Sequence, residues 1–154
     1  MSERYLSKIV MDLLLERKND KTGRNEILLL ERMGTGYYDG YYDLPGGHLE
    51  EGEDIFDGMI REAKEEIGIT ILREDMEIKH IYHAFQKNAL KFVFNAKKYI
   101  GPIINNEPQS CKSLEWFEID NLPENIIPSI KIELENIRNQ KYYDASKKQN
   151  LAKH

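Results

Sequence analysis

Residues 47–69 read GHLEEGEDIFDGMIREAKEEIGI and carry the most informative pattern in the chain. Within this stretch Glu62, Glu65 and Glu66 recur three and four residues apart. On a helix, at about 100° per residue, the three side chains fall within an arc of about 100° and can converge on one object. Carboxylates that close repel one another unless a cation holds them together, and hard oxygen ligands suit Mg²⁺ or Mn²⁺. The stretch therefore predicts a helix that presents a divalent-metal site.

The same helix has an apolar stripe that predicts how it packs. Glu66 falls at the edge of this stripe, where a carboxylate is costly unless it is paired or metal-bound. Arg61 points to the opposite side but can reach Glu65 four residues on. Gly58 lies on the arc of the carboxylates and leaves room for a ligand. A solvated acidic helix is the alternative, and the position of Glu66 disfavours it. The stripe consists of Ile55, Phe56, Met59, Ile60, Ala63 and Ile67.

This stretch resembles the Nudix box, the signature of the Nudix hydrolases. Gly47, Glu53 and the run from Arg61 to Ile69 occupy the positions that the signature specifies. Ala63 stands where a bulkier aliphatic residue is often found. The resemblance implies an α/β protein with the Nudix fold, a mixed β-sheet sandwiched between helices. It also implies hydrolysis of a nucleoside diphosphate linked to another group.

The resemblance further implies roles for individual residues. Glu53 would either support the loop before the helix or bind a second metal ion through water, and Arg61 would orient the glutamates. The cofactor would be Mg²⁺, with Mn²⁺ as a substitute. Which carboxylate acts as the general base stays open, because the family places it variably. The catalytic candidates are Glu53, Arg61, Glu62, Glu65 and Glu66, and the metal ligands are Gly46, through its carbonyl, with Glu62, Glu65 and Glu66.

Four further residues are candidates for substrate binding. Arg32 ends a predicted strand, and its guanidinium matches phosphate geometry, although an exposed strand-end charge is the alternative. Residues 34–42 read GTGYYDGYY, a glycine-rich loop whose tyrosines could stack on a base. Tyr42 is the candidate from this loop, although ordinary packing is equally compatible with each tyrosine. His48 could contact the leaving group or the base, or be structural.

Two segments indicate the substrate class. LPGGHLEEGE at residues 44–53, together with NNEPQSCKSLEWFEIDNLP at residues 105–123, is similar to Nudix enzymes that act on nucleoside triphosphates. In that branch the acidic residue before Pro, here Glu107, lies near the substrate. Branches that cleave ADP-ribose commonly carry a Pro downstream of the box, and those that cleave dinucleoside polyphosphates a Tyr. Residues 82–87 read YHAFQK, without Pro and with the Tyr short of the usual place.

The resemblance thus favours hydrolysis of (deoxy)nucleoside triphosphates, including oxidised or modified purine nucleotides, to monophosphate and pyrophosphate. An ADP-ribose or nucleotide-sugar pyrophosphatase is the first alternative. A non-catalytic Nudix-fold binding or regulatory module is the second, and it is disfavoured because all the box glutamates are present.

Length and composition predict one domain over residues 1–140, followed by a polar tail over residues 141–154. The 154 residues are 40% hydrophobic and 32% charged, as in a soluble globular protein. The net charge of −5 disfavours a nucleic-acid partner or an anionic membrane. Cys111 is the single cysteine, so no internal disulfide can form, and a cytoplasmic location is expected. The expected partner is a small nucleotide substrate, and a homodimer is compatible with the sequence.

Periodicity predicts the remaining elements. The first two strands should pair as a hairpin, and so should the two strands after residue 76. A helix from Pro128 should cover the sheet face opposite the box helix. The tail from Lys141 should be frayed. The predicted strands span residues 5–16, 26–32, 43–50, 69–72, 77–86, 90–96 and 114–117.

Overall fold

The structure is a computed structural model, and it describes residues 3–146. Two helices and two three-residue 3₁₀ turns alternate with nine strands along this part of the chain. In chain order the elements are β1 (Lys8–Leu14), β2 (Glu16–Lys18), β3 (Asn25–Arg32), β4 (Tyr42–Asp43), β5 (Gly46–His48), α1 (Ile55–Ile67), η1 (Arg73–Asp75), β6 (Met76–Ala84), η2 (Phe85–Lys87), β7 (Ala89–Ala96), β8 (Cys111–Glu118), α2 (Pro128–Arg138) and β9 (Tyr143–Ala145).

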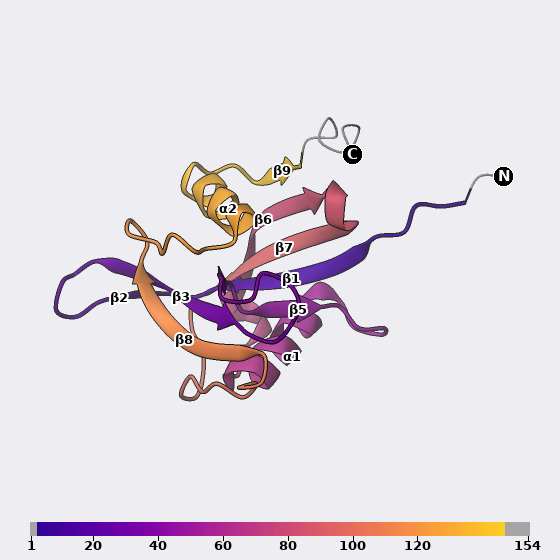
Figure 1. Cartoon of the computed structure of the whole chain (residues 1–154). Coiled ribbons are helices and arrows are strands. Elements are labelled where there is room, and N and C mark those ends of the chain that lie inside the picture. Colours follow the sequence, from indigo (N-terminus) through magenta and orange to yellow (C-terminus); the bar gives the residue numbers. More distant parts are fainter. Residues whose placement is uncertain (1–2, 147–154) are drawn as a thin grey trace.

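The strands form two sheets. The five-stranded sheet has the order β5-β1-β7-β6-β9 and is mixed, because β1 runs parallel to β7 and β6 runs parallel to β9. The four-stranded sheet is antiparallel, with β3 pairing with β2, β4 and β8. The prediction of an α/β protein with a mixed sheet between helices is confirmed (Figure 1).

Helix α1 begins and ends where its terminal residues predict. Asp54 caps the N-terminus, accepting a hydrogen bond from the Asp57 N–H while the Asp57 side chain returns one to the Asp54 N–H. Gly68 ends the helix with φ of 78°, a left-handed conformation that glycine adopts without strain. The predicted apolar stripe faces the core, with Met59, Ala63 and Ile67 fully buried. Burial of this stripe fixes which way the carboxylates of α1 face.

The two helices cover opposite faces of the five-stranded sheet, as predicted (Figure 1). Neighbouring strand residues point to opposite faces. Phe94 of β7 packs in the cluster that contains α1, whereas Val93 packs with Ile130 and Leu134 of α2. Pro128 begins α2 as predicted. Each helix therefore has its own hydrophobic core, and the sheet separates them.

The predicted hairpin between the first two strands is wrong in its pairing. Strand β1 pairs with β5 and β7, whereas only the three residues of β2 pair with β3. The chain passes from one sheet to the other at Leu15, which is buried. The end of β1 is thereby buried in the five-stranded sheet, whereas the side chains of β2 are exposed. The other predicted hairpin, β6 with β7, is confirmed.

Two further expectations need correction. Residues 69–72 form no strand; Ile69 and Ile71 are buried, but the backbone makes only an isolated bridge between Thr70 and Ile100. The tail from Lys141 was predicted to be frayed, but part of it forms β9, which pairs with β6 at the edge of the five-stranded sheet. Residues 147–154 of the predicted tail lie outside the described residues. Within residues 3–146, no helix is long and apolar enough to cross a membrane.

Candidate active site

Arg61 is the centre of the carboxylate cluster on α1. Its Nε and Nη2 donate to the two oxygens of Glu53, over 3.0 and 2.8 Å. Its Nη1 donates to Glu62 over 2.9 Å and to Glu65 over 3.2 Å. Nη2 also donates to the His48 carbonyl over 3.0 Å. One guanidinium therefore ties the helix to the loop before it, and its hydrogen bonds with Glu53 and then Glu62 raise its pKa.

The Glu53 carboxylate accepts hydrogen bonds from two parts of the protein, the Arg61 side chain and the backbone of the loop before α1. Besides its two bonds from Arg61, it accepts a hydrogen bond from the Glu50 N–H over 2.8 Å. The hydrogen bond from Arg61 is the main reason why the pKa of Glu53 is lowered. These contacts are those of a residue that supports the loop, one of the two roles expected for it.

Glu66 is the most strongly perturbed carboxylate of the cluster. Its Oε1 accepts a hydrogen bond from the Gly46 N–H over 2.9 Å. Burial raises the pKa of Glu66 to about 8, and the negative charges of Glu107, Glu62 and Asp43 add to the effect. Burial likewise raises the pKa of Glu62, where Arg61 works against it. Negative charge therefore converges on Glu66 from α1, from β4 and from the loop before β8.

The turn from β4 into β5 allows this close approach through Gly46 and Gly47, which are also the first two residues of β5. A Cβ on Gly47 would lie 2.3 Å from the Glu62 carboxylate. A Cβ on Gly46 would lie 2.1 Å from the Met11 carbonyl oxygen and 2.6 Å from Asp12 Oδ1. On Gly58 a Cβ would lie 2.6 Å from the Met11 Cε. Gly46 therefore excludes a side chain, because a Cβ there would meet backbone, whereas at Gly47 and Gly58 it would meet the movable end of a side chain, at Gly47 that of a predicted metal ligand.

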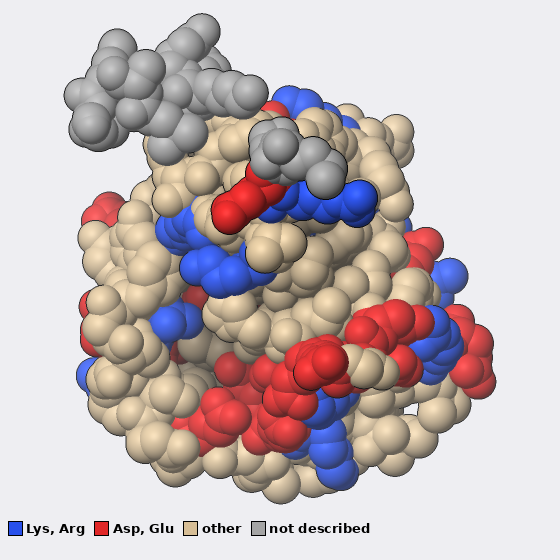
Figure 2. All heavy atoms as spheres, turned by 90° about the vertical axis from the view of Figure 1, so that its right-hand side faces the viewer, with Lys and Arg blue, Asp and Glu red and all other residues tan. Residues whose placement is uncertain are grey.

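The donor set suits a hard divalent cation. Glu62 and Glu66 approach the Gly46–Gly47 turn, and all the groups are oxygen donors. Glu65 is half exposed, and its carboxylate forms an ion pair with Arg61. No three Asp, Glu, His or Cys side chains of the described residues stand close enough together to hold a metal ion, and Arg61 binds two of the predicted ligands, Glu62 and Glu65. Figure 2 shows the surrounding surface, where acidic side chains form a band with basic ones above and among them.

A loop that precedes β8 brings Glu107 to this cluster. The Asn106 N–H donates to the Glu66 carbonyl over 3.1 Å, and the Asn106 side chain donates to the Lys64 carbonyl. The Glu107 carbonyl accepts from the N–H groups of Ser110 and Cys111, which closes the loop. Glu107 is therefore positioned against the end of α1, although it lies far from it in sequence.

The other substrate-binding candidates lie on β3, β4 and β5. Arg32 donates to the Tyr37 carbonyl over 2.6 Å, to Asp43 over 3.1 Å and to the Thr35 hydroxyl over 3.0 Å. The Tyr42 ring is buried against Phe117, and its hydroxyl donates to Glu115. The ring faces that remain exposed in this loop belong to Tyr37, Tyr38 and Tyr41. His48 is exposed, and only its carbonyl joins the Arg61 network. Substrate contact by these candidates stays a prediction.

The sequence reasoning missed a buried charged cluster next to the turn. Lys91 lies 3.2 Å from Asp12 and 3.0 Å from Glu133, and all three are largely buried. Burial raises the pKa of Asp43 to about 6, and the nearby Asp12 adds to this. The signal was an acidic residue inside the apolar run that forms β1, since such a residue must find a partner when it is buried.

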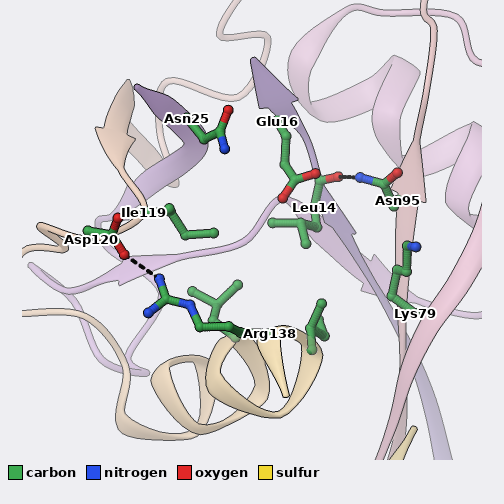
Figure 3. A pocket seen from close by; sticks show the side chains of 10 residues that line it. Leu14, Glu16, Asn25, Lys79, Asn95, Ile119, Asp120 and Arg138 are labelled. Atoms are coloured by element: carbon green, nitrogen blue, oxygen red, sulfur yellow. Dashed lines mark hydrogen bonds and ion pairs between the residues drawn. The ribbon is translucent and has the colours of Figure 1, made fainter. Parts of the chain in front are cut away.

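A separate pocket of about 420 Å³ contains none of the predicted site residues. It is lined by α2 and by strand ends, including Leu14, Asn95 and Leu134. Figure 3 shows two pairs among its polar groups, with Asn95 donating to the Leu14 carbonyl and Arg138 bound to Asp120.

Comparison with known proteins identifies one family. The model of the NUDIX domain matches residues 11–137. The Nudix hydrolase YvcI of Bacillus subtilis (strain 168), described as uncharacterized, is 27% identical over 105 residues, which cover 64% of this chain and 61% of that protein. The ADP-ribose pyrophosphatase of Methanocaldococcus jannaschii is 29% identical over 102 residues, 64% of this chain and 58% of that protein. The matched segments span less than two thirds of either relative.

The fold has solved counterparts as well. The crystal structure of a MutT NUDIX hydrolase from Burkholderia pseudomallei matches with a TM-score of 0.72 and 26% identity. The match covers 84% of this chain and 96% of that one. The likeness therefore extends from the motif at residues 47–69 to the arrangement of both sheets and both helices.

Proposed function

The chain belongs to the Nudix hydrolase family, and on that premise we propose that it is a Mg²⁺-dependent pyrophosphohydrolase of (deoxy)nucleoside triphosphates. Nudix hydrolases act on small nucleotide substrates. The proposed products are nucleoside monophosphate and pyrophosphate, with oxidised or modified purine nucleotides among the substrates. Mn²⁺ would substitute for Mg²⁺.

The observation that carries this proposal is the environment of Glu66. A buried carboxylate surrounded by the charges of Glu107, Glu62 and Asp43 is unfavourable, which is why its pKa is raised to about 8. A divalent cation would remove this repulsion and make the ionised form the stable one. A purely structural helix has no reason to gather these charges at one glycine turn.

The residues that would hold Mg²⁺ are Glu62, Glu65 and Glu66 with the Gly46 carbonyl. The ion would neutralise pyrophosphate oxygens and lower the pKa of a bound water. Arg61 would keep Glu62 and Glu65 oriented, and Glu53 would in turn hold Arg61. Arg32 and Glu107 are the proposed substrate contacts.

The triphosphate preference is supported by the segments at residues 44–53 and 105–123. The likeness to an ADP-ribose pyrophosphatase favours a second candidate, cleavage of ADP-ribose or a nucleotide sugar. The experiment is a side-by-side measurement of kcat/KM for dGTP, 8-oxo-dGTP, ADP-ribose and a nucleotide sugar at saturating Mg²⁺. A triphosphate should be preferred by at least tenfold, about 1.4 kcal/mol of transition-state stabilisation. A tenfold preference for ADP-ribose or the sugar would contradict the triphosphate proposal and leave only the family's general reaction.

A further inference from the structure

Lys87, at the turn η2 between β6 and β7, lies against the tyrosine loop of residues 34–42. Its Nζ is 3.7 Å from the ring centroid of Tyr37 and 5.5 Å from that of Tyr38. An ammonium this close to an aromatic face is attracted by the ring's negative face. Residues that are far apart in the sequence therefore meet here, without a local pattern that predicts it.

A second cation reaches the same ring. The Arg32 guanidinium lies 5.1 Å from the Tyr37 ring centroid, and its Nε donates to the Tyr37 carbonyl. Tyr37 is thus in contact with Arg32, at the end of β3, and with Lys87, in the turn η2 that follows β6. Its ring is better placed to position these groups than to stack on a base, the role expected for the loop.

Lys87 differs from the neighbouring cations in having no direct ion-pair partner among the described residues. Arg32 is paired with Asp43, and Lys91 is paired with Asp12 and Glu133. Among residues 3–146, no carboxylate oxygen lies within ion-pair distance of Lys87. Although the residue reaches solvent, burial of its ammonium lowers the pKa of Lys87 to about 8; the like charges of Lys91 and Arg32 add to this, and the carboxylates of Glu133 and Asp12 oppose it. Since its two cationic neighbours already have carboxylate partners, Lys87 has the ammonium that an incoming anion can bind.

This cationic group is connected to the carboxylate site. Asp43 pairs with Arg32 and is also one of the charges that act on Glu66. Asp43 ends β4, and the chain reaches the Gly46 turn three residues later. A polyanion that is bound at the carboxylate site and extends past Asp43 would therefore meet Arg32 and the neighbouring Lys87.

We propose that Lys87 is a specificity-determining residue that, with Arg32 and Tyr37, binds a phosphate group of the substrate's polyphosphate chain. This inference rests on the proposed function for its ligand, an inorganic or nucleoside polyphosphate. A positive charge here favours substrates with several consecutive phosphates over those whose diphosphate is capped by a neutral sugar. Lys87 binds substrate and takes no part in proton transfer.

The first test compares Lys87→Met with Lys87→Arg and with Lys98→Met. Lys98 is exposed and lies beyond the opposite end of β7, so it matches the charge change without touching the loop. At constant free Mg²⁺, Lys87→Met should raise both the KM for dGTP and the Ki of inorganic tripolyphosphate about tenfold, with a smaller fall in kcat. Lys87→Arg should stay within about threefold of the wild type, and Lys98→Met should equal it. An unchanged KM and Ki in Lys87→Met, or tripolyphosphate inhibition that is not competitive with dGTP, would overturn the proposal.

The second test does not depend on catalysis. An amine-reactive reagent is applied to the wild-type protein with and without tripolyphosphate, and labelling of Lys87 and Lys98 is read by mass spectrometry. Tripolyphosphate should slow labelling of Lys87 about tenfold and leave Lys98 unchanged. Equal labelling of Lys87 in both conditions overturns the anion site, whatever the enzyme hydrolyses. Protection of Lys87 in a protein that prefers ADP-ribose to triphosphates supports the anion site and contradicts only the proposed substrate.

Discussion

At the scale of the residue, the proposed site depends on Glu66, whose ionised carboxylate is destabilised by burial and by neighbouring negative charges. Glu66 is buried at the edge of the apolar stripe of α1, and the Gly46 N–H is the group that stabilises its charged form. Arg61 compensates Glu62 and Glu65 instead. Glu66 therefore has the most to gain from a cation, and it is the residue whose neutralisation is most informative.

Replacing Glu66 by Gln should separate catalysis from folding. A neutral amide is a poor metal ligand, so kcat should fall at least 100-fold at saturating Mg²⁺. The metal-free protein should be as stable as the wild type or more stable, because repulsion from Glu62, Glu107 and Asp43 disappears. Turnover by pyrophosphate release and unfolding in urea measure the two effects. The control is Glu51→Gln, at an exposed glutamate in the loop before α1. Turnover of Glu66→Gln near that of the control would remove Glu66 from the metal site.

The raised pKa of Glu66 also predicts how metal-free stability depends on pH. The folded state keeps the proton up to about pH 8, whereas the unfolded chain loses it near pH 4.3. Between these values the folded state binds more protons, so the free energy of unfolding is highest below pH 4.3 with respect to this group and falls as pH rises through 8. Denaturation in EDTA should show the wild type losing more stability from pH 5 to 8.5 than Glu66→Gln. Parallel curves for the two proteins would contradict the assignment.

At the scale of the element, the site is the meeting of α1 with the turn that follows β4. The apolar stripe sets the rotation of α1, and the glycines let the turn come close enough to touch its carboxylates. The two glycines face different neighbours. A Cβ at Gly46 would meet backbone, whereas a Cβ at Gly47 would meet the end of the Glu62 side chain.

This difference predicts opposite outcomes for two alanine substitutions. Gly46→Ala should lower the free energy of unfolding by more than about 2 kcal/mol, because the Met11 backbone in β1 cannot move without disturbing the sheet. Gly47→Ala should displace only Glu62, so it should reduce kcat strongly and stability by less than about 1 kcal/mol. Urea unfolding and pyrophosphate release on both variants provide the measurement. Equal losses of stability in the two variants would contradict this account of the turn.

The elements that the sequence predicted well are those with local signals. Helix α1 has its stripe, its Asp54 cap and its terminal Gly68, and the hairpin of β6 and β7 has alternating residues on both sides of a turn. The failures are non-local. Nothing near residue 15 indicates that the chain changes sheets there, and the pairing of β9 with β6 depends on a strand far away in sequence. The packing of the Tyr42 ring against Phe117 of β8 is also non-local, and contact of Tyr42 with substrate stays a prediction.

At the scale of the whole molecule, a buried charged cluster joins elements from both ends of the chain. Lys91 of β7 contacts Asp12 of β1 and Glu133 of α2. Burial alone would lower the pKa of Lys91, but these two carboxylates raise it. The cluster lies beside the Gly46 turn, since Asp12 is paired with Gly46 across the sheet. The packing of α2 and the position of the active-site turn therefore depend on the same charges.

Removing the cation should destabilise the whole fold. Lys91→Met leaves two buried carboxylates without their partner, and it should lower the free energy of unfolding by about 3–5 kcal/mol at pH 8. The loss should be smaller at pH 5, where Glu133 can take up a proton, because burial raises the pKa of Glu133 to about 7. Urea unfolding at the two pH values measures this, with Lys98→Met as the control. A loss below about 1 kcal/mol at pH 8 would mean that the cluster is not important for stability.

Direct measurement of metal binding tests the central claim, that the carboxylates of α1 and the Gly46 turn form a divalent-metal site. Mn²⁺ is titrated into the wild-type protein and into Glu66→Gln, and free Mn²⁺ is followed by electron paramagnetic resonance. The account predicts saturable binding to the wild type, competition by Mg²⁺, and at least tenfold weaker binding to Glu66→Gln, about 1.4 kcal/mol. Binding of Mn²⁺ to the two proteins with the same affinity and stoichiometry would contradict it.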